Sequence, residues 1–283
     1  FAVGENTITA QYGGSMGLKP QTGSTQLVVQ GDLQNATVKV DGEYFYTGSP
    51  VTPEVSVTWN GTQLTKDTDY TISYENSNGG KDNLTNAGTV TVTVTGKGNY
   101  IGTKTATFTI AQSGTAFDGG VTVDKTDKTY TYGEEITVTV TPKATGAAPA
   151  NNLLTLVEPA AGQMAIYEGD RQLTEAKNVT SGSTLTFTIK TAEAGLGSGK
   201  HTLTAKFVGT DNMAAQTGTV EVTINPASIS NANVTVNGGP FIYTGSPITP
   251  EVNVTWNGTQ LTKDTDYTLA YENNTNVGTP TVT

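Results

Sequence analysis

The sequence predicts an all-β protein, built as an elongated array of tandem antiparallel β-sandwich modules. Many short segments alternate apolar and polar residues with a period of two, which is typical of strands with one buried face. Turn residues, above all Gly, Asn and Pro, separate these segments. Long stretches of the sequence also occur twice, and such internal repeats indicate an array of similar folding units.

Two repeats with nearly equal offsets define two kinds of module. Residues 46–76 and 243–273 differ at only four of 31 paired positions and lie 197 residues apart. Residues 7–29 align with residues 202–224 at an offset of 195. We call the module that contains residues 46–76 type B and the module that contains residues 202–224 type A. The type A and type B pair is therefore the repeating unit.

The predicted organisation has four parts. They are the C-terminal part of a type A module (1–31), a complete type B module (32–112), a complete type A module (113–227) and an incomplete type B module (228–283). After Asn273 the second type B copy lacks seven residues of the first and ends at Thr283, opposite Thr93. The counterparts of residues 94–110 are absent. We therefore expect part of a longer array, whose last sheet has an open edge for pairing with another chain.

Each complete module reads as a succession of short strands. In type B, Val55, Val57 and Trp59 share one face of a strand, and the Asn60-Gly61 pair that follows is typical of a two-residue hairpin turn. Further strands are expected in type B at 70–74, 89–98 and 106–110, and in type A at 136–140, 185–189 and 203–207. The only helix-like stretch, at 192–196, is too short for more than a turn.

Composition excludes several classes of partner. The net charge is −10 and no cluster of Lys and Arg occurs, so we expect no nucleic-acid partner. No apolar stretch approaches the length of a membrane helix, so no direct membrane insertion is expected. The absence of Cys excludes a disulfide scaffold and thiol chemistry. No cofactor is expected.

Particular motifs resemble modules of bacterial surface proteins. "YGEEITVTVTP" and "GSGKHTLTAKFVGTDN" in type A resemble bacterial immunoglobulin-like repeats of secreted and wall-attached proteins. "YTGSP", "DTDYT" and "AGTVTVTVTGKGNYIGT" in type B are similar to another β repeat of clostridial-type surface proteins. The resemblance implies an extracellular, secreted or cell-surface bacterial protein with immunoglobulin-like sandwiches. It implies no residue roles, since no catalytic motif defines these families.

The aromatic residues of type B are the candidates for a ligand site. Trp59 and Trp256 each precede an Asn-Gly turn, and a ring exposed there beside Tyr70 or Tyr74 could stack on a sugar. The phase of Trp59 with Val55 and Val57 favours a core position instead.

Two acidic pairs and one histidine are the other candidates. Asp67 and Asp69, repeated as Asp264 and Asp266, could contribute to a calcium site, but Asp also favours turns, which is the preferred interpretation. His201 is the only histidine, and its counterpart in the first type A copy is Asn6. A structural role is therefore preferred to catalysis, and no catalytic residue is predicted.

Covalent modification is a weaker possibility. Lys125 or Lys128 would be the donor to test for a Lys–Asn crosslink, as found in some surface sandwiches that the fold resembles. Asn-X-Thr triplets carry little weight in a bacterial protein. They begin at Asn35, Asn60, Asn83, Asn178, Asn233, Asn257 and Asn273.

Three hypotheses about function follow. The first is a non-catalytic stalk or spacer that holds another domain away from the cell wall. The second is an adhesin or carbohydrate-binding segment, whose partner would be a host or cell-wall protein or glycan. The third is a set of accessory domains of a larger secreted enzyme.

Overall fold

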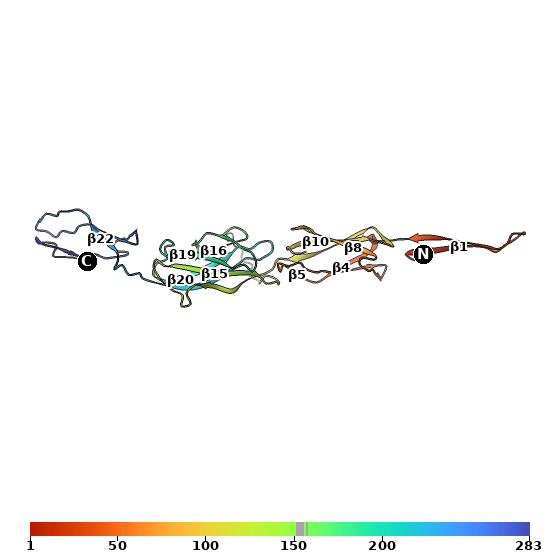
Figure 1. Cartoon of the computed structure of the whole chain (residues 1–283), viewed down its shortest axis with the longest axis horizontal. Coiled ribbons are helices and arrows are strands. Elements are labelled where there is room, and N and C mark those ends of the chain that lie inside the picture. The colour runs from red at the N-terminus through yellow and green to blue at the C-terminus, as the bar shows by residue number, and fades with distance from the viewer. Residues whose placement is uncertain (151–155, 157) are drawn as a thin grey trace.

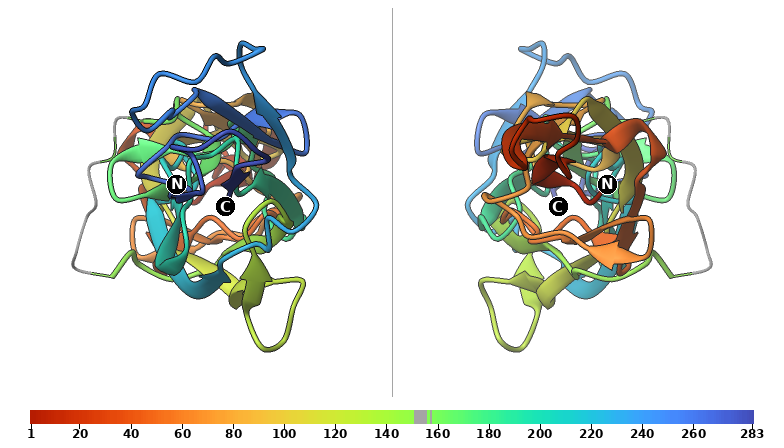
Figure 2. Two further views of the ribbon diagram at one scale, coloured as in Figure 1. Left: turned by 90° about the vertical axis from the view of Figure 1, so that its left-hand side faces the viewer. Right: turned by 90° about the vertical axis from the view of Figure 1, so that its right-hand side faces the viewer.

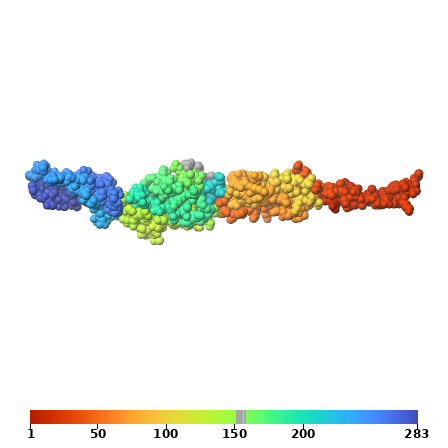
Figure 3. All heavy atoms as spheres, turned by 45° about the horizontal axis from the view of Figure 1, so that its top comes forward, coloured from red at the N-terminus to blue at the C-terminus, as the bar shows by residue number. Residues whose placement is uncertain are grey.

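The computed structural model describes residues 1–150, 156 and 158–283. Figures 1 and 3 show β-structured units that follow one another in chain order along a single long axis. Viewed along that axis, the units overlap within a narrow outline (Figure 2). The predicted fold class, an elongated array of antiparallel β-sandwich modules, is confirmed. The module boundaries after residues 31, 112 and 227 remain predictions.

Residues 4–29 form a two-stranded hairpin. β1 (Gly4–Tyr12) pairs antiparallel with β2 (Gln21–Val29) in a two-stranded sheet. Val28 is 58% exposed and Met16, in the connecting loop, is fully exposed. Neither face of the hairpin is covered in the way that a sandwich sheet is covered.

The type B module is a sandwich of two sheets. One has the strand order β4-β6-β7 and the other β5-β12-β10-β8-β9, and a short parallel pair, β3 with β11, lies beside them. The elements are β3 (Gly31–Asp32), the 3-10 turn η1 (Leu33–Asn35), β4 (Thr37–Asp41), β5 (Tyr44–Phe45), β6 (Glu54–Trp59), β7 (Thr62–Gln63), β8 (Tyr70–Asn76), β9 (Gly80–Lys81), β10 (Gly88–Gly96), β11 (Tyr100–Ile101) and β12 (Thr103–Ala111).

In this sandwich, the apolar residues of each alternating segment face the core and the polar residues between them face away from it. Val90, Val92 and Val94 of β10 are fully buried, while the threonines between them point to the other face of the sheet. Asn60 and Gly61 both have positive φ, +46° and +79°, as the predicted two-residue turn requires. The predicted strands and turn are confirmed here.

The type A module is a second, larger sandwich. Its sheets have the orders β13-β15-β19 and β14-β21-β20-β16-β17, with β18 also paired to β16. The strands are β13 (Thr115–Val123), β14 (Thr129–Thr131), β15 (Glu135–Ala144), β16 (Gln163–Glu168), β17 (Arg171–Gln172), β18 (Lys177–Asn178), β19 (Leu185–Lys190), β20 (Gly199–Phe207) and β21 (Gln216–Asn225).

Apolar residues from both sheets of type A fill one core. Ile136 on β15, Phe187 on β19 and Phe207 on β20 are at most 1% exposed. The turn predicted at 192–196 lies between β19 and β20, and Leu196 in it is fully buried. The core is therefore closed at that end by a turn rather than by a strand.

The last unit repeats the first half of the type B module. Its strands are β22 (Asn233–Val236), β23 (Val252–Trp256), β24 (Thr259–Gln260), β25 (Tyr271–Glu272) and β26 (Thr281–Val282). The order β22-β23-β24 matches β4-β6-β7, and the pair Tyr271–Val282 matches Tyr74–Val92, as the seven-residue deletion predicts. Among the described strands, β26 pairs with β25 alone, so its second edge is open.

Candidate functional site

The junction between the type B and type A modules is built from residues that are distant in sequence. The Asn212 Oδ1 atom accepts a hydrogen bond from the Ala87 amide at 2.7 Å, and the Gln112 Nε2 atom donates to the Thr210 carbonyl at 2.6 Å. Tyr46, which opens the repeated segment, packs against the core of type A. The two sandwiches therefore share a specific polar and aromatic contact, which we call the B–A junction.

The connection through this junction is itself buried. Only residues 112–114 separate β12 from β13, and Ser113 between them is fully buried. The Ser113 amide donates to the Asn212 carbonyl at 2.9 Å, and its Oγ accepts from the Gly146 amide at 3.0 Å. A linker held in this way acts as part of the structure, not as a flexible tether.

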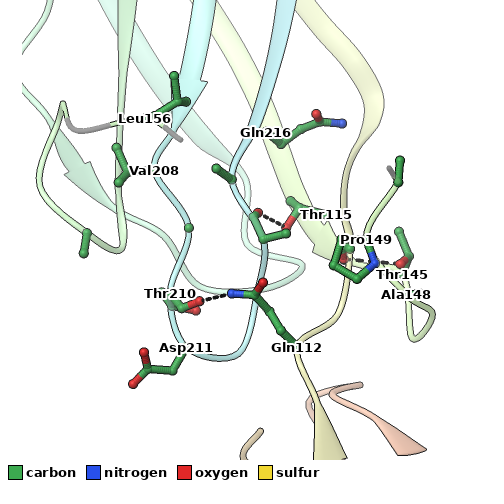
Figure 4. Close-up of a pocket in the computed structure, with 16 residues that line it drawn as sticks. Gln112, Thr115, Thr145, Ala148, Pro149, Leu156, Val208, Thr210, Asp211 and Gln216 are labelled. Carbon is green, nitrogen blue, oxygen red and sulfur yellow. Dashed lines mark hydrogen bonds between the residues drawn. The ribbon is translucent and has the colours of Figure 1, made fainter. Parts of the chain in front are cut away.

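A cavity of about 720 Å³ opens beside the junction (Figure 4). Gln112, Thr115, Thr210 and Gln216 contribute polar groups to its lining. Gln112 donates to the Thr210 carbonyl and Thr115 donates to the Ala214 carbonyl, as the dashed lines in Figure 4 show. Gln112 and Thr115 are therefore engaged within the protein, and Asp211, a charged residue of the lining, points away from them in Figure 4.

Trp59 lies at the end of β6 against its own module. Its Nε1 atom donates to the Asp32 carbonyl at 2.9 Å, and its ring meets Tyr100 edge to face, with 5.7 Å between the ring centroids. A Cβ at Gly31 would lie 3.3 Å from the indole, so the chain passes close to the ring. The Trp59 indole is half-buried, and its aromatic neighbour is Tyr100 rather than Tyr70 or Tyr74.

Tyr70 and Tyr74 lie on β8, and both contact the type B core. Tyr70 is 3% exposed and Tyr74 is partly buried. Burial raises the pKa of both phenols. A ring as deeply buried as Tyr70 has no free face for a sugar to stack on.

Trp256 has the equivalent position on β23 but a different neighbour. Its ring stacks on Tyr132 of the type A module, with 6.2 Å between the centroids and 27° between the planes. The candidate aromatic residues are thus not brought together into one surface, since each tryptophan has its own partner.

The acidic pairs form two copies of one turn. The Asp69 Oδ2 atom accepts from the Thr65 amide at 2.8 Å, and Asp266 accepts from Thr262 at 2.7 Å. The residue two before each of these acids has positive φ, +67° at Asp67 and +65° at Asp264. One carboxylate of each pair is therefore used to hold the turn, which leaves few oxygens for a cation that needs six or more.

His201 belongs to a charged cluster at one end of type A. Its Nδ1 atom lies 2.5 Å from Glu168 Oε1, and its Nε2 atom lies 2.8 Å from the Gly197 carbonyl oxygen. Glu168 Oε2 also accepts from Arg171 at 2.6 Å. The hydrogen bond with His201 is the main cause that lowers the pKa of the Glu168 carboxyl. Among the described residues, no hydroxyl group is hydrogen-bonded to this cluster. The cluster ties the turn at 192–198 to β16 and β20.

The candidate modification sites lie at the surface. Lys125 pairs with Glu134 at 2.7 Å, and Lys128 is exposed in a tight turn with φ of +54°. Asn60 and Asn257 lie at the tips of hairpin turns. Within the part of the chain that the structure describes, neither lysine has an asparagine among its hydrogen-bonded or ion-pair partners.

Within the described residues, two features of a ligand site and a membrane-spanning helix are not found. No three or more His, Cys, Asp or Glu side chains gather where they could hold a metal ion. No buried side-chain nitrogen or oxygen lacks a hydrogen-bond partner. None of the helices found there has the length and hydrophobicity to cross a membrane.

Sequence reasoning missed the B–A junction. Several of the contacting residues, among them Ala87 and Asn212, lie within the repeat motifs of the two modules, but those motifs imply no residue roles. The loop that contains Asn212 differs from its counterpart in the first hairpin at seven of the eight positions 208–215, although the strands on either side align. The sequence therefore marks this loop as variable between copies but does not single out Asn212.

Comparison with solved structures finds modules of several multidomain proteins. The chain is similar to fibronectin(III)-like modules of Clostridium thermocellum CbhA, with 10% identity and a TM-score of 0.26, over 67% of this chain and 95% of that one. It is similar to the D00-D0 domain of intimin, with 14% identity and a TM-score of 0.26, over 66% of this chain and 99% of that one.

The S-layer protein SbsC matches over a longer stretch. Its domains 1–6 cover 99% of this chain, at 16% identity and a TM-score of 0.27, and the match spans 43% of that chain. No protein-family model matches the sequence, and no curated protein does. At these identities and TM-scores the likenesses assign no ligand and no role to this chain.

Proposed function

We propose that this chain is a non-catalytic stalk segment of a modular, extracellular bacterial surface protein. Its modules would hold another part of the protein at a distance from the cell wall. The type A modules would belong with bacterial immunoglobulin-like repeats and the type B modules with clostridial-type surface repeats, as the sequence motifs suggest.

The buried linker at the B–A junction is the observation that carries this proposal. A spacer needs to resist bending, and a three-residue connection with a fully buried Ser113 between two hydrogen-bonded sandwiches leaves little freedom at the joint. The repeating module pair adds length without requiring new interactions, because each module has its own core.

Small-angle X-ray scattering tests the proposal. Each of the four units is about as long as one nine-residue strand, roughly 30 Å, so the rod should have a radius of gyration near 35 Å, estimated as about 120 Å divided by the square root of 12. A compact globule of this chain length would have about 19 Å. A value close to that of the globule would contradict the stalk.

A further inference from the structure

The stacked rings of Trp256 and Tyr132 join two modules. Trp256 is the last residue of β23 in the final unit, and Tyr132 follows β14 in type A. Their ring planes lie 27° apart, so the rings meet face to face rather than edge to face. The contact spans 124 residues of sequence and bridges the linker between β21 and β22.

The type A side of this contact is a firmly held platform. The Tyr132 amide donates to the Asn225 carbonyl at 2.9 Å, which fixes it to the end of β21. The Gly133 amide donates to the Thr191 Oγ1 atom at 2.8 Å, and Thr191 is fully buried. Tyr132 itself packs against the type A core. The loop 131–134 therefore presents its ring in a defined orientation.

Gly133 makes room for the indole. A Cβ built at this position would lie 2.9 Å from Trp256 Cη2 and 3.3 Å from Cζ3, closer than side-chain carbons approach one another. Its φ of +96° is also a conformation that suits glycine. The Trp256 indole therefore stacks on the Tyr132 ring and also occupies the space that a side chain at position 133 would fill.

On the final unit, Trp256 ends the strand face that carries Val252 and Val254, which are about 5% exposed. Asn257 and Gly258 turn the chain immediately after it, with φ of +46° and +81°. This turn fixes where the strand ends and therefore where the backbone of Trp256 lies.

We propose that Trp256 is the contact that fixes the final unit to the type A module before it, and that Gly133 leaves the space its indole occupies. This inference rests on the proposed stalk function, because it explains how the joint between type A and the next type B resists bending. It also assigns Trp256 to the joint between modules rather than to a carbohydrate site.

The two indole N–H resonances of the whole chain provide the test. In a proton–nitrogen correlation spectrum, Trp59→Phe identifies the resonance of Trp59, and the other belongs to Trp256. Tyr132→Ala should shift the Trp256 resonance and leave that of Trp59 in place, because Trp59 packs on Tyr100 instead. Acrylamide quenching of Trp256 in the Trp59→Phe background should rise about twofold to tenfold when Tyr132 is replaced.

Glycine variants separate this contact from general damage to the fold. Gly133→Ala should shift the Trp256 resonance as Tyr132→Ala does. Gly182→Ala is the matched control, since Gly182 also has positive φ, +78°, but has nothing within 4 Å of an added Cβ. It should leave both indole resonances unchanged.

The proposal would be overturned if the Trp256 indole resonance were unchanged in both Tyr132→Ala and Gly133→Ala. The scattering profile of the unmodified chain distinguishes this failure from failure of the stalk. If scattering shows a rod but the Trp256 resonance does not respond to these substitutions, only the proposed contact of Trp256 is rejected. If scattering shows a compact globule, the stalk function is rejected.

Discussion

Glu168 accepts hydrogen bonds from two basic side chains, and its ionisation therefore contributes to the stability of the type A module. Bonding to His201 is the largest cause that lowers its pKa, burial opposes this, and Arg171 reinforces it. A carboxyl with a lowered pKa binds its proton more weakly in the folded than in the unfolded state. Its stabilisation is therefore complete above the unfolded pKa, about 4.3, and is lost as the pH falls through the folded pKa.

We predict that Glu168→Gln lowers the free energy of unfolding of type A by about 1 kcal/mol at pH 7, since the side chain is partly exposed to solvent. The difference between the variant and the wild type should shrink below about pH 4. Urea titrations of the variant and the wild type at several pH values measure this difference in the free energy of unfolding. Glu175→Gln, which removes an exposed carboxylate of the same module, is the control for loss of a charge. A difference that is constant down to pH 2 would refute the role given to Glu168.

At the scale of elements, one hairpin occurs twice in two different environments. β1 and β2 pair from Gly4–Val29 to Tyr12–Gln21, and β20 and β21 pair from Gly199–Ile224 to Phe207–Gln216. The two registers are identical after a shift of 195 residues. Only β20 and β21 are covered by a second sheet. Comparing the two hairpins therefore separates the contribution of strand pairing to stability from the contribution of burial.

Hydrogen exchange should show this separation. We predict that amides of β20 and β21 exchange about a thousandfold more slowly, or more, than their counterparts in β1 and β2, because an uncovered two-stranded hairpin is marginally stable whereas a folded module has about 5 kcal/mol or more. Mass spectrometry of peptides from both hairpins measures the rates. Equal protection would mean that β1 and β2 are covered in solution.

The elements were predictable because their signals are local or repeated. The alternating valines predict β10, and the Asn60-Gly61 turn predicts where β6 ends. The alignment of residues 7–29 with residues 202–224 predicts β1 and β2. The partners of the candidate residues were not predictable in this way. Trp59 and Trp256 have nearly identical local sequences, yet Trp59 meets Tyr100 and Trp256 meets Tyr132. The second copy has no counterpart of Tyr100, so the neighbour of each ring depends on residues distant in sequence.

For the whole molecule, stiffness depends on how modules meet rather than on the modules themselves. The B–A junction joins the two sandwiches through Asn212, whose Oδ1 atom is the hydrogen-bond partner of the Ala87 amide. Ala87 is 4% exposed, so this amide would lose its partner without regaining water if the side chain were removed. One residue of type A therefore stabilises the end of type B.

Asn212→Ala should accordingly destabilise a module to which it does not belong. We expect the free energy of unfolding of type B to fall by about 1–3 kcal/mol, the cost of a buried amide left without a partner. Exchange of the Ala87 amide should quicken, and scattering should show a shorter maximum dimension as the joint begins to bend. Asp211→Ala is the matched control, because Asp211 is exposed and adjacent. If Asn212→Ala changed only type A, or neither module, the hydrogen bond between Asn212 and Ala87 would not couple the two sandwiches. Stiffness of the joint would then have to come from the buried linker and from the contacts of Gln112 and Tyr46.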